Sequence, residues 1–565
     1  MQQRFSILAV GSFIFLLLII NEYCPGFFHR EVIYAYTTLC IAVALLFQVL
    51  YRKRNDWNIS LFDVAIGLLV LYGVGRSLIC DNEFVDGVVL YKWLAVLLGY
   101  IWIRNFSQKE IILYALVLSG VEEAVTCISQ YMGWVGSYHS FFEITGHLGN
   151  PGPLGGYLAV CLTVAVHLLK KALKEKKNKL RIGLLASIIL LAIGIILSNS
   201  RAAWLGTIIG CLFLIPAISL RSLLKTKRIV LFIGLLILLG ALLYSYRPKS
   251  ANARLLIWTV SADMVSDKPF TGHGWCSFQK KYMLYQAKYL KEKGSEEERL
   301  IADNVTYTYN EWLHLTVETG FIGLLFALFI VVNIYRVKSV NNFNLTIQAA
   351  SAAWLTFSIF SYPTDIFPLL MLFPFLLGCI QSEKHFIFFK NYVVKIPVFF
   401  LLLCISMGSL WEGMFYLRAS KEIADVFKTD NVSGKLFAQK NYPKLKNNIT
   451  FNMTYLQNLV RHSSDLHDDN IVDKIIPNTE TYIWLGNYYH RTGKYQKAEQ
   501  AYLLASDMVP NRMMANYKLW RMYLELGNEK KSIEIAKRIL SQPVKVINSF
   551  TINARTEIKT FLSDK

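Results

Sequence analysis

Long apolar segments, separated by short polar loops, fill residues 1–412 of the chain. A membrane-spanning helix needs about 20 consecutive apolar residues. By this criterion the sequence predicts thirteen transmembrane helices, at 5–21, 32–51, 61–80, 86–103, 111–132, 153–169, 182–198, 202–220, 229–246, 312–334, 345–361, 365–381 and 395–412. The expected fold class is therefore all-α, with a polytopic membrane helix bundle as its larger part.

The tail, residues 413–565, is polar with helical periodicity and is expected to be a separate helical domain. It contains a pattern typical of tetratricopeptide repeats, formed by Tyr482, Leu485, Gly486, Tyr489, Ala498, Tyr502, Ala505 and Pro510. Leu519, Tyr523, Ser532 and Ala536 repeat it 34 residues later, with Pro543 nearly in register. This predicts a solenoid whose role is either a stability cap or a surface for a protein partner or acceptor.

The net charge of +20 would suggest nucleic-acid binding in a soluble protein. Here most Lys and Arg residues lie in alternate short loops, so the positive-inside rule explains them and no nucleic-acid partner is expected. The same rule predicts a cytoplasmic N-terminus and an extracytoplasmic tail. The long loop 247–311 then faces the extracytoplasmic side. Nine scattered cysteines without a CxxC motif indicate neither a zinc site nor a disulfide framework.

A polar stripe enters one predicted span in the sequence "YNEWLHLTVETGFIG". Asn310, His314 and Glu318 are spaced i, i+4, i+8 and therefore share one face of a helix. Polar and ionisable side chains inside a membrane are costly and usually face a cavity where they function.

Other charges also lie within predicted spans. Arg76 and Lys92 are near the outer ends of their helices, where they either reach the lipid headgroups or form an anion site. Glu122 and Glu123 lie midway along 111–132 and are interpreted as members of an ion pair between helices. Arg201, in a tight outer turn, is placed to bind phosphate in a bidentate manner.

Four segments resemble the O-antigen ligase and polymerase superfamily of bacterial membrane glycosyltransferases. They are "GHLGNPGPLGGYLA", "SNSRAAWLG", "ARLLIWTVSADMVSDKPFTGHGWCSF" and "YNEWLHLTVETGFIG", and together they cover roughly residues 140–335. Asn310, Gly320 and Gly323 fit a superfamily pattern of Asn and two Gly. The repeat tail resembles an extension found in some members.

The resemblance implies glycan transfer from an undecaprenyl diphosphate carrier at the outer face of the bacterial cytoplasmic membrane. The acceptor hydroxyl would belong to lipid A-core, a protein or another glycan. No metal or cofactor is implied, because arginines neutralise the diphosphate and a histidine is the proposed base. Arg201 and Arg254 match the superfamily arginines, Lys92 matches by location alone, and Arg76 is a further candidate at the same outer face.

The sequence departs from the superfamily at the base, because Tyr309 stands before Asn310 where a histidine is expected. Our hypothesis is that His314, one helical turn below Asn310, takes this role. Glu318 would then hold the imidazole in one tautomer. The candidate catalytic residues are thus His314, Tyr309, Glu318 and Asn310.

Three alternatives remain from the sequence. A repeat-unit polymerase would use the same donor with a lipid-linked glycan as acceptor. A glycolipid transporter would be expected to show two symmetric halves, and no such duplication is apparent. A scaffold acting through its repeats would leave Arg201, Arg254 and the polar stripe without a role.

Overall fold

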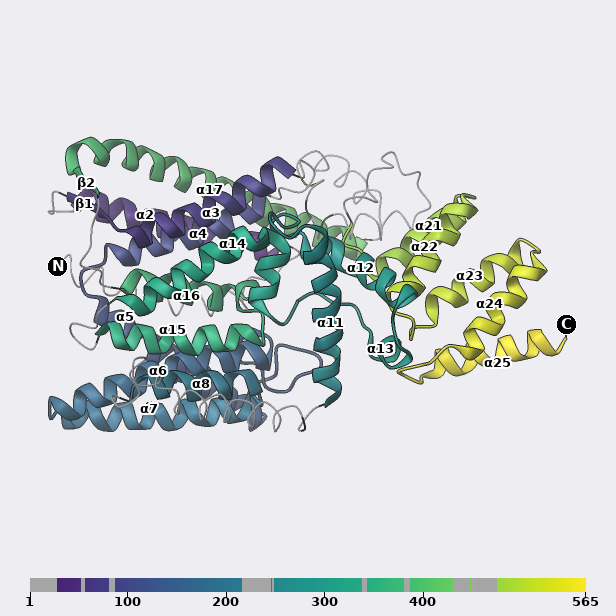
Figure 1. Cartoon of the computed structure of the whole chain (residues 1–565), viewed down its shortest axis with the longest axis horizontal. Coiled ribbons are helices and arrows are strands. Elements are labelled where there is room, and N and C mark those ends of the chain that lie inside the picture. The colour runs from purple at the N-terminus through teal and green to yellow at the C-terminus, as the bar shows by residue number, and fades with distance from the viewer. Residues whose placement is uncertain are drawn as a thin grey trace.

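The structure, a computed structural model, describes residues 28–51, 56–80, 87–215, 248–337, 343–380, 387–429 and 475–564, and the single residues 245, 445, 448 and 451. Helices dominate it, which confirms the predicted all-α class (Figure 1). One short antiparallel sheet was not predicted: β1 (Asp56–Ile59) pairs with β2 (Ile387–Lys390). This sheet joins the segments that lead into two helices far apart in the sequence.

The bundle helices coincide with eleven of the thirteen predicted spans. They are α2 (His29–Tyr51), α3 (Leu61–Cys80), α4 (Gly87–Arg104), α5 (Lys109–Tyr131), α6 (Pro151–Lys174), α7 (Asn178–Leu197), α8 (Arg201–Phe213), α14 (Glu311–Arg336), α15 (Phe343–Ile359), α16 (Phe367–Cys379) and α17 (Asn391–Thr429). The predicted spans 5–21 and 229–246 lie outside the described residues, apart from residue 245. Helix α8 ends before the predicted residue 220, since Pro216 follows in the sequence.

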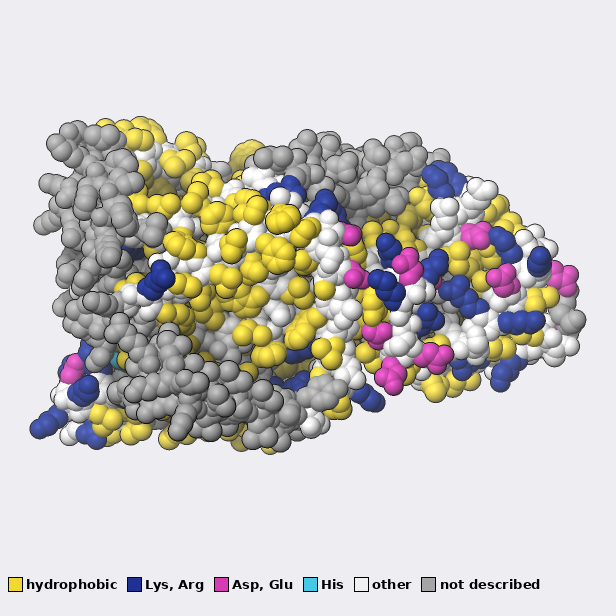
Figure 2. Space-filling view, in the orientation of Figure 1, with side chains coloured by type: hydrophobic (Ala, Val, Ile, Leu, Met, Phe, Trp, Pro, Cys, Tyr) yellow, Lys and Arg dark blue, Asp and Glu magenta, His cyan; other side chains and the backbone are white. Residues whose placement is uncertain are grey.

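Six described helices are long and apolar enough to cross a membrane: His29–Leu50, Lys109–Tyr131, Pro151–Lys174, Asn178–Leu197, Glu311–Arg336 and Lys395–Ile423. Figure 2 shows hydrophobic side chains over the bundle and charged side chains gathered over the repeat helices. On α7, Ile182, Ile189 and Ile196 are 69%, 59% and 67% exposed at heptad spacing. Such an outward apolar stripe is typical of a lipid-facing helix, while the total of thirteen spans stays a prediction.

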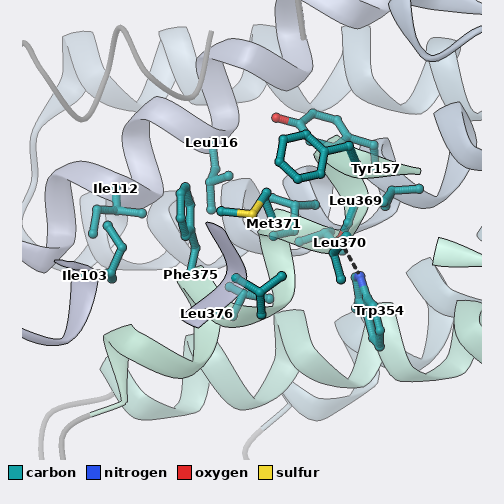
Figure 3. Close-up of a cluster of buried hydrophobic side chains, with 14 of the residues drawn as sticks. Ile103, Ile112, Leu116, Tyr157, Trp354, Leu369, Leu370, Met371, Phe375 and Leu376 are labelled. Atoms are coloured by element: carbon teal, nitrogen blue, oxygen red, sulfur yellow. Dashed lines mark hydrogen bonds between the residues drawn. The ribbon is translucent and has the colours of Figure 1, made fainter. Parts of the chain in front are cut away.

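The bundle core is a layer of large apolar side chains drawn from α4, α5, α6, α15 and α16 (Figure 3). Within it, the Trp354 indole N–H donates to the Leu369 carbonyl at 3.0 Å, which links α15 to α16. The motif "GNPGPLGG" begins α6, and its small residues allow close packing. Gly156 faces the Phe357 ring, and Gly155 faces Ser200 at the start of α8. The motif therefore fixes the hairpin that carries Arg201.

Helix α14 is broken at Gly320, whose backbone has φ 67° and ψ −171°. The loop 268–274 docks against this break and supplies the missing hydrogen-bond partners. The bonds are His273 N to Val317 O (2.9 Å), Gly274 N to Glu318 O (2.8 Å), Phe321 N to Pro269 O (2.8 Å) and Ile322 N to Phe270 O (3.3 Å). The turns of α14 before the break, which carry His314 and Glu318, are therefore positioned separately from the turns after it.

We expect Gly320→Ala to destabilise the protein strongly. This combination of positive φ and extended ψ alone costs a non-glycine residue about 1–3 kcal/mol, and an added Cβ would also overlap the Phe270 carbonyl. Gly75→Ala is the matched control, because Gly75 lies in α3 with open space beside it. Thermal unfolding in detergent should show a lower midpoint for Gly320→Ala and an unchanged or slightly higher one for Gly75→Ala. Equal midpoints would contradict this role of Gly320.

Three helices of the long loop stand between the bundle and the C-terminal helices (Figure 1). They are α11 (Pro248–Asp267), α12 (Phe278–Glu292) and α13 (Glu296–Ile301). The predicted domain boundary at residue 412 falls inside α17, which continues to Thr429.

The tail contains α21 (Thr479–Arg491), α22 (Tyr495–Met508), α23 (Met514–Glu525), α24 (Glu529–Ser541) and α25 (Ser549–Ser563). The small and aromatic positions of the repeat pattern are buried: Ala498 and Ala505 are inaccessible, and Gly486 lies against the Tyr502 ring. The helices form successive hairpins, and their tetratricopeptide type stays a prediction.

Candidate functional site

His314 lies in the N-terminal part of α14 with 9% of its surface exposed. Its Nε2 is 3.2 Å from Oε1 of Glu318, one turn further along the helix. Glu318 is itself held in place, because its Oε1 accepts the backbone N–H of Phe278 at 3.3 Å. The carboxylate is therefore placed to orient the imidazole ring.

The second ring nitrogen of His314 faces two further carboxyl groups. Nδ1 is 3.7 Å from Oδ2 of Asp365 and 3.9 Å from Oε1 of Glu311. Within the described part of the chain, neither this Nδ1 nor Oδ2 of Asp365 has a hydrogen-bond partner. Buried polar atoms are normally hydrogen-bonded, so an orphaned pair facing each other indicates a place for a ligand group.

Asp365 is presented by the link between α15 and α16, in the short helix η2 (Pro363–Asp365). The neighbouring Thr364 donates both its backbone N–H (3.3 Å) and its hydroxyl to the Glu311 carboxylate. This contact fixes the link against the first turn of α14. As a result, the carboxyl groups of Glu311 and Glu318 on α14 and of Asp365 on the link all lie near the His314 imidazole.

A cavity of about 580 Å³ opens beside this cluster. Its charged and polar lining includes His314, Glu318, Glu311, Asp365, Lys92, Arg30, Glu31 and Lys280, and much of its apolar lining comes from α3, α4, α14 and α16. Lys92 from α4 also lies 5.6 Å from the centre of the Trp93 ring. The predicted residues His314, Glu318 and Lys92 thus share one cavity.

The two predicted arginines lie near enough for their charges to interact, and Arg254 stands beside Tyr309, just before the first turn of α14. Arg254 on α11 donates to the Phe360 carbonyl at 3.0 Å. Burial, together with the nearby positive charge of Arg201, lowers the pKa of Arg254. Both burial and the repulsion from Arg201 disfavour the charged form of Arg254. A bound anion would offset both effects.

Tyr309 joins this arginine pair to the histidine. Its ring lies 5.1 Å from the Arg254 guanidinium and 5.3 Å from the Tyr362 ring, and its backbone is left-handed with φ 53°. Burial raises the pKa of Tyr309, so its phenol is not suited to take a proton at neutral pH. Tyr362 precedes Asp365 by three residues, and Tyr309 precedes His314 by five. The short segments 309–314 and 362–365 therefore each contribute one residue near Arg254 and one residue of the His314 cluster.

Asn310 and Arg76 have mainly positioning contacts. Asn310 caps α14, its side-chain oxygen accepting the Leu313 N–H at 3.1 Å. Arg76 donates to the Thr271 carbonyl (3.0 Å), the Thr271 hydroxyl (3.1 Å) and the Gly272 carbonyl (3.1 Å). Arg76 thus braces the loop docked at the α14 break, and it does not line the cavity described above.

Sequence reasoning missed Glu311, Asp365 and Arg30 as members of the site. Glu311 stands within the quoted stripe motif but off its i, i+4 spacing. Asp365 is a lone acid in the apolar sequence "SYPTDIFPLL", which was a usable signal under the rule that charges in apolar spans mark function.

Glu122 and Glu123 form a separate polar cluster with His147 of η1 (Gly146–Leu148). His147 Nδ1 lies 3.1 Å from Glu123 and 3.4 Å from Glu122. Among the described residues this is one group whose donor atoms, all within 4.8 Å of one another, have the chemistry of a metal site. The contact links α5 to the start of α6, and none of the three residues lines the central cavity.

Comparison with known proteins agrees with the motifs. Residues 186–328 match the O-antigen ligase family model. This range includes Arg201, Arg254, Tyr309, His314 and Glu318, but neither Lys92 nor Asp365. No curated protein matches the sequence.

Proposed function

On the strength of its O-antigen ligase domain, we propose that this multi-pass membrane protein transfers a glycan from undecaprenyl diphosphate to an acceptor hydroxyl at the outer face of the bacterial cytoplasmic membrane. The acceptor oxygen attacks the anomeric carbon, the bond from that carbon to the phosphate oxygen breaks, and the electron pair leaves with the diphosphate. The hydroxyl proton is taken up by the enzyme. Attack opposite the leaving group inverts the anomeric centre.

The supporting observation is the pairing of two chemically different sides around the first turn of α14. Arg254 and Arg201 form a cationic side suited to a diphosphate leaving group. His314, with its unpartnered Nδ1 near Asp365, forms a side suited to an acceptor hydroxyl. Tyr309 lies between them.

In this proposal each residue has a defined task. Glu318 accepts a hydrogen bond from the Nε2–H of His314 and so holds the proton on that nitrogen. The lone pair on Nδ1 is then available to receive the hydroxyl proton. Asp365 and Glu311 then stabilise the resulting imidazolium. Lys92 contributes a cation at the cavity wall, while Asn310 and Arg76 hold the backbone that carries the site.

The direct test is a deletion strain in which lipid-linked glycans and cell-surface acceptors are both analysed. Loss of the gene should cause the undecaprenyl diphosphate-linked glycan to accumulate and one class of acceptor to lose its glycan. If the protein were a polymerase, loss of its gene would instead leave single repeat units attached to the acceptor. Unchanged lipid-linked and acceptor-linked glycans would refute the proposal.

The proposed site requires an extracytoplasmic C-terminal region. We expect alkaline phosphatase fused after residue 565 to be active and the same enzyme fused near residue 175 to be inactive, because the basic loop around 170–181 is expected in the cytoplasm. A β-galactosidase fusion at each position is the control and should give the opposite pattern. The reverse result would place the whole site on the cytoplasmic side.

A further inference from the structure

The C-terminal helices contact the segment 302–310, which runs from the end of α13 to the cap of α14. Asn511, which is 5% exposed, donates its side-chain N–H groups to the carbonyls of Arg299 (3.1 Å), Leu300 (3.1 Å) and Ala302 (2.7 Å). These are carbonyls at the end of α13 that lack partners within the helix. A residue of the repeat region thus caps a helix of the long loop.

Asp303 is the charged centre of the same contact. Its carboxylate accepts Arg512 at 2.7 Å and Lys545 at 3.1 Å, from two different parts of the repeat region. Burial alone would raise the pKa of Asp303, but hydrogen bonds from Lys545 and the Asn304 N–H, with the charges of Lys545 and Arg512, lower it. The carboxylate is therefore ionised and paired at neutral pH.

Two further side chains, Asn304 and Gln286, extend this contact. Asn304 Oδ1 accepts both the backbone N–H (3.1 Å) and the hydroxyl (2.9 Å) of Thr479, at the start of α21. Gln286 of α12 is inaccessible to solvent and donates to the carbonyls of Asp303 (3.0 Å) and Met508 (2.7 Å). Long loop and repeats also share an apolar cluster that includes Met508, Val509, Ala302 and Val317.

The C-terminal end of segment 302–310 leads into the candidate site, at Tyr309 and Asn310. Trp258 of α11 donates to the Thr308 carbonyl at 2.9 Å, and Tyr309 then packs against Arg254. Tyr309 is the sixth residue after Asp303, so a chain of roughly 20 Å at most connects the repeat contact to the arginine side. A displacement at Asp303 is therefore transmitted to Tyr309 through a short, anchored segment.

We propose that the repeat region holds the segment 302–310 in place at the transfer site, with Asp303 as a positioning residue that sets the Tyr309–Arg254 contact. This inference rests on the proposed function. It assigns the repeats a task beyond a stability cap, because the segment they hold leads directly into the diphosphate side. Any partner bound by the repeats would then act on the site through Asp303.

The test compares Asp303→Asn with Arg521→Gln in the purified full-length protein. Asp303→Asn removes the negative charge and keeps the shape of the side chain. Arg521→Gln removes an ion pair of similar exposure, to Glu557 at 3.0 Å, that lies within the repeats and away from the segment. Since half-exposed ion pairs are weak, Asp303→Asn should raise the Kd for undecaprenyl diphosphate by roughly threefold to tenfold. Arg521→Gln should leave it unchanged.

Amide hydrogen exchange supplies a readout that does not depend on substrate. Asp303→Asn should speed exchange in residues 302–310, and Arg521→Gln should not. If the parent protein neither binds undecaprenyl diphosphate nor transfers glycan, the proposed function fails, and the exchange result still decides the positioning role.

Exchanging the charges of Asp303 and its two partners separates a positioning role from a general loss of stability. Asp303→Lys should weaken undecaprenyl diphosphate binding further, and combining it with Arg512→Glu and Lys545→Glu should restore binding and slow exchange again. Unchanged exchange and unchanged Kd in Asp303→Asn, or no recovery in the charge-exchanged protein, would overturn the inference.

Discussion

Arg254→Ala and Arg201→Ala are each expected to reduce glycan transfer by about 100- to 1000-fold, the usual effect of removing a group that stabilises charge in a transition state. Negative charge develops on the leaving diphosphate, and these two guanidinium groups lie close enough for Arg201 to lower the pKa of Arg254. Transfer by washed membranes at matched protein abundance is the measurement. Undecaprenyl diphosphate-linked glycan from the deletion strain is the donor.

Lysine at these positions should restore little activity. Arg254 donates to the Phe360 carbonyl and lies over the Tyr309 ring, so a planar, multidentate group is needed to keep both contacts and still reach a phosphate. Arg181→Ala is the control, because Arg181 lies in the first turn of α7, at the predicted cytoplasmic side, and contacts Asn178. Parental transfer by either site variant would remove that arginine from the leaving-group role.

The apolar pattern predicted the bundle well because membrane spans are defined by a single quantity, the length of an apolar run. It does not mark where a helix continues beyond its apolar part. Helix α17 continues through residue 412 to Thr429, and hydropathy marks only the end of its apolar part. The sheet between β1 and β2 joins segments more than 300 residues apart, a distance that no local pattern bridges.

The site was only partly predictable for a similar reason. His314 and Glu318 are one helical turn apart, so periodicity alone placed them together. Asp365 comes from a different helix pair, and its approach to His314 depends on Thr364 bonding to Glu311. For Arg76 the sequence left two possibilities open, the lipid headgroups or an anion site, and the structure adds contacts with Thr271 and Gly272 that no local pattern indicates.

The expected results at His314 separate its role from that of Tyr309. His314→Ala should lower transfer by roughly 100-fold or more, because it removes the group placed to take the hydroxyl proton. Glu318→Gln should have an intermediate effect, since the amide keeps a hydrogen-bond acceptor for Nε2 but loses the charge that stabilises the imidazolium. Tyr309→Phe should cost little, because the ring that packs on Arg254 remains and burial already raises the pKa of the phenol.

Asp365→Asn completes the set and tests the side of His314 that the sequence did not reveal. If the acceptor hydroxyl lies between Nδ1 of His314 and Oδ2 of Asp365, this variant should lose transfer by about 100-fold while still binding undecaprenyl diphosphate at the arginine side. His273→Ala serves as the histidine control, because its ring Nε2 bonds the Met264 carbonyl and His273 is not among the residues that line the cavity. A severe loss in Tyr309→Phe, with His314→Ala and Asp365→Asn near normal, would make the buried histidine and its three carboxylates a structural cluster and move proton transfer to Tyr309.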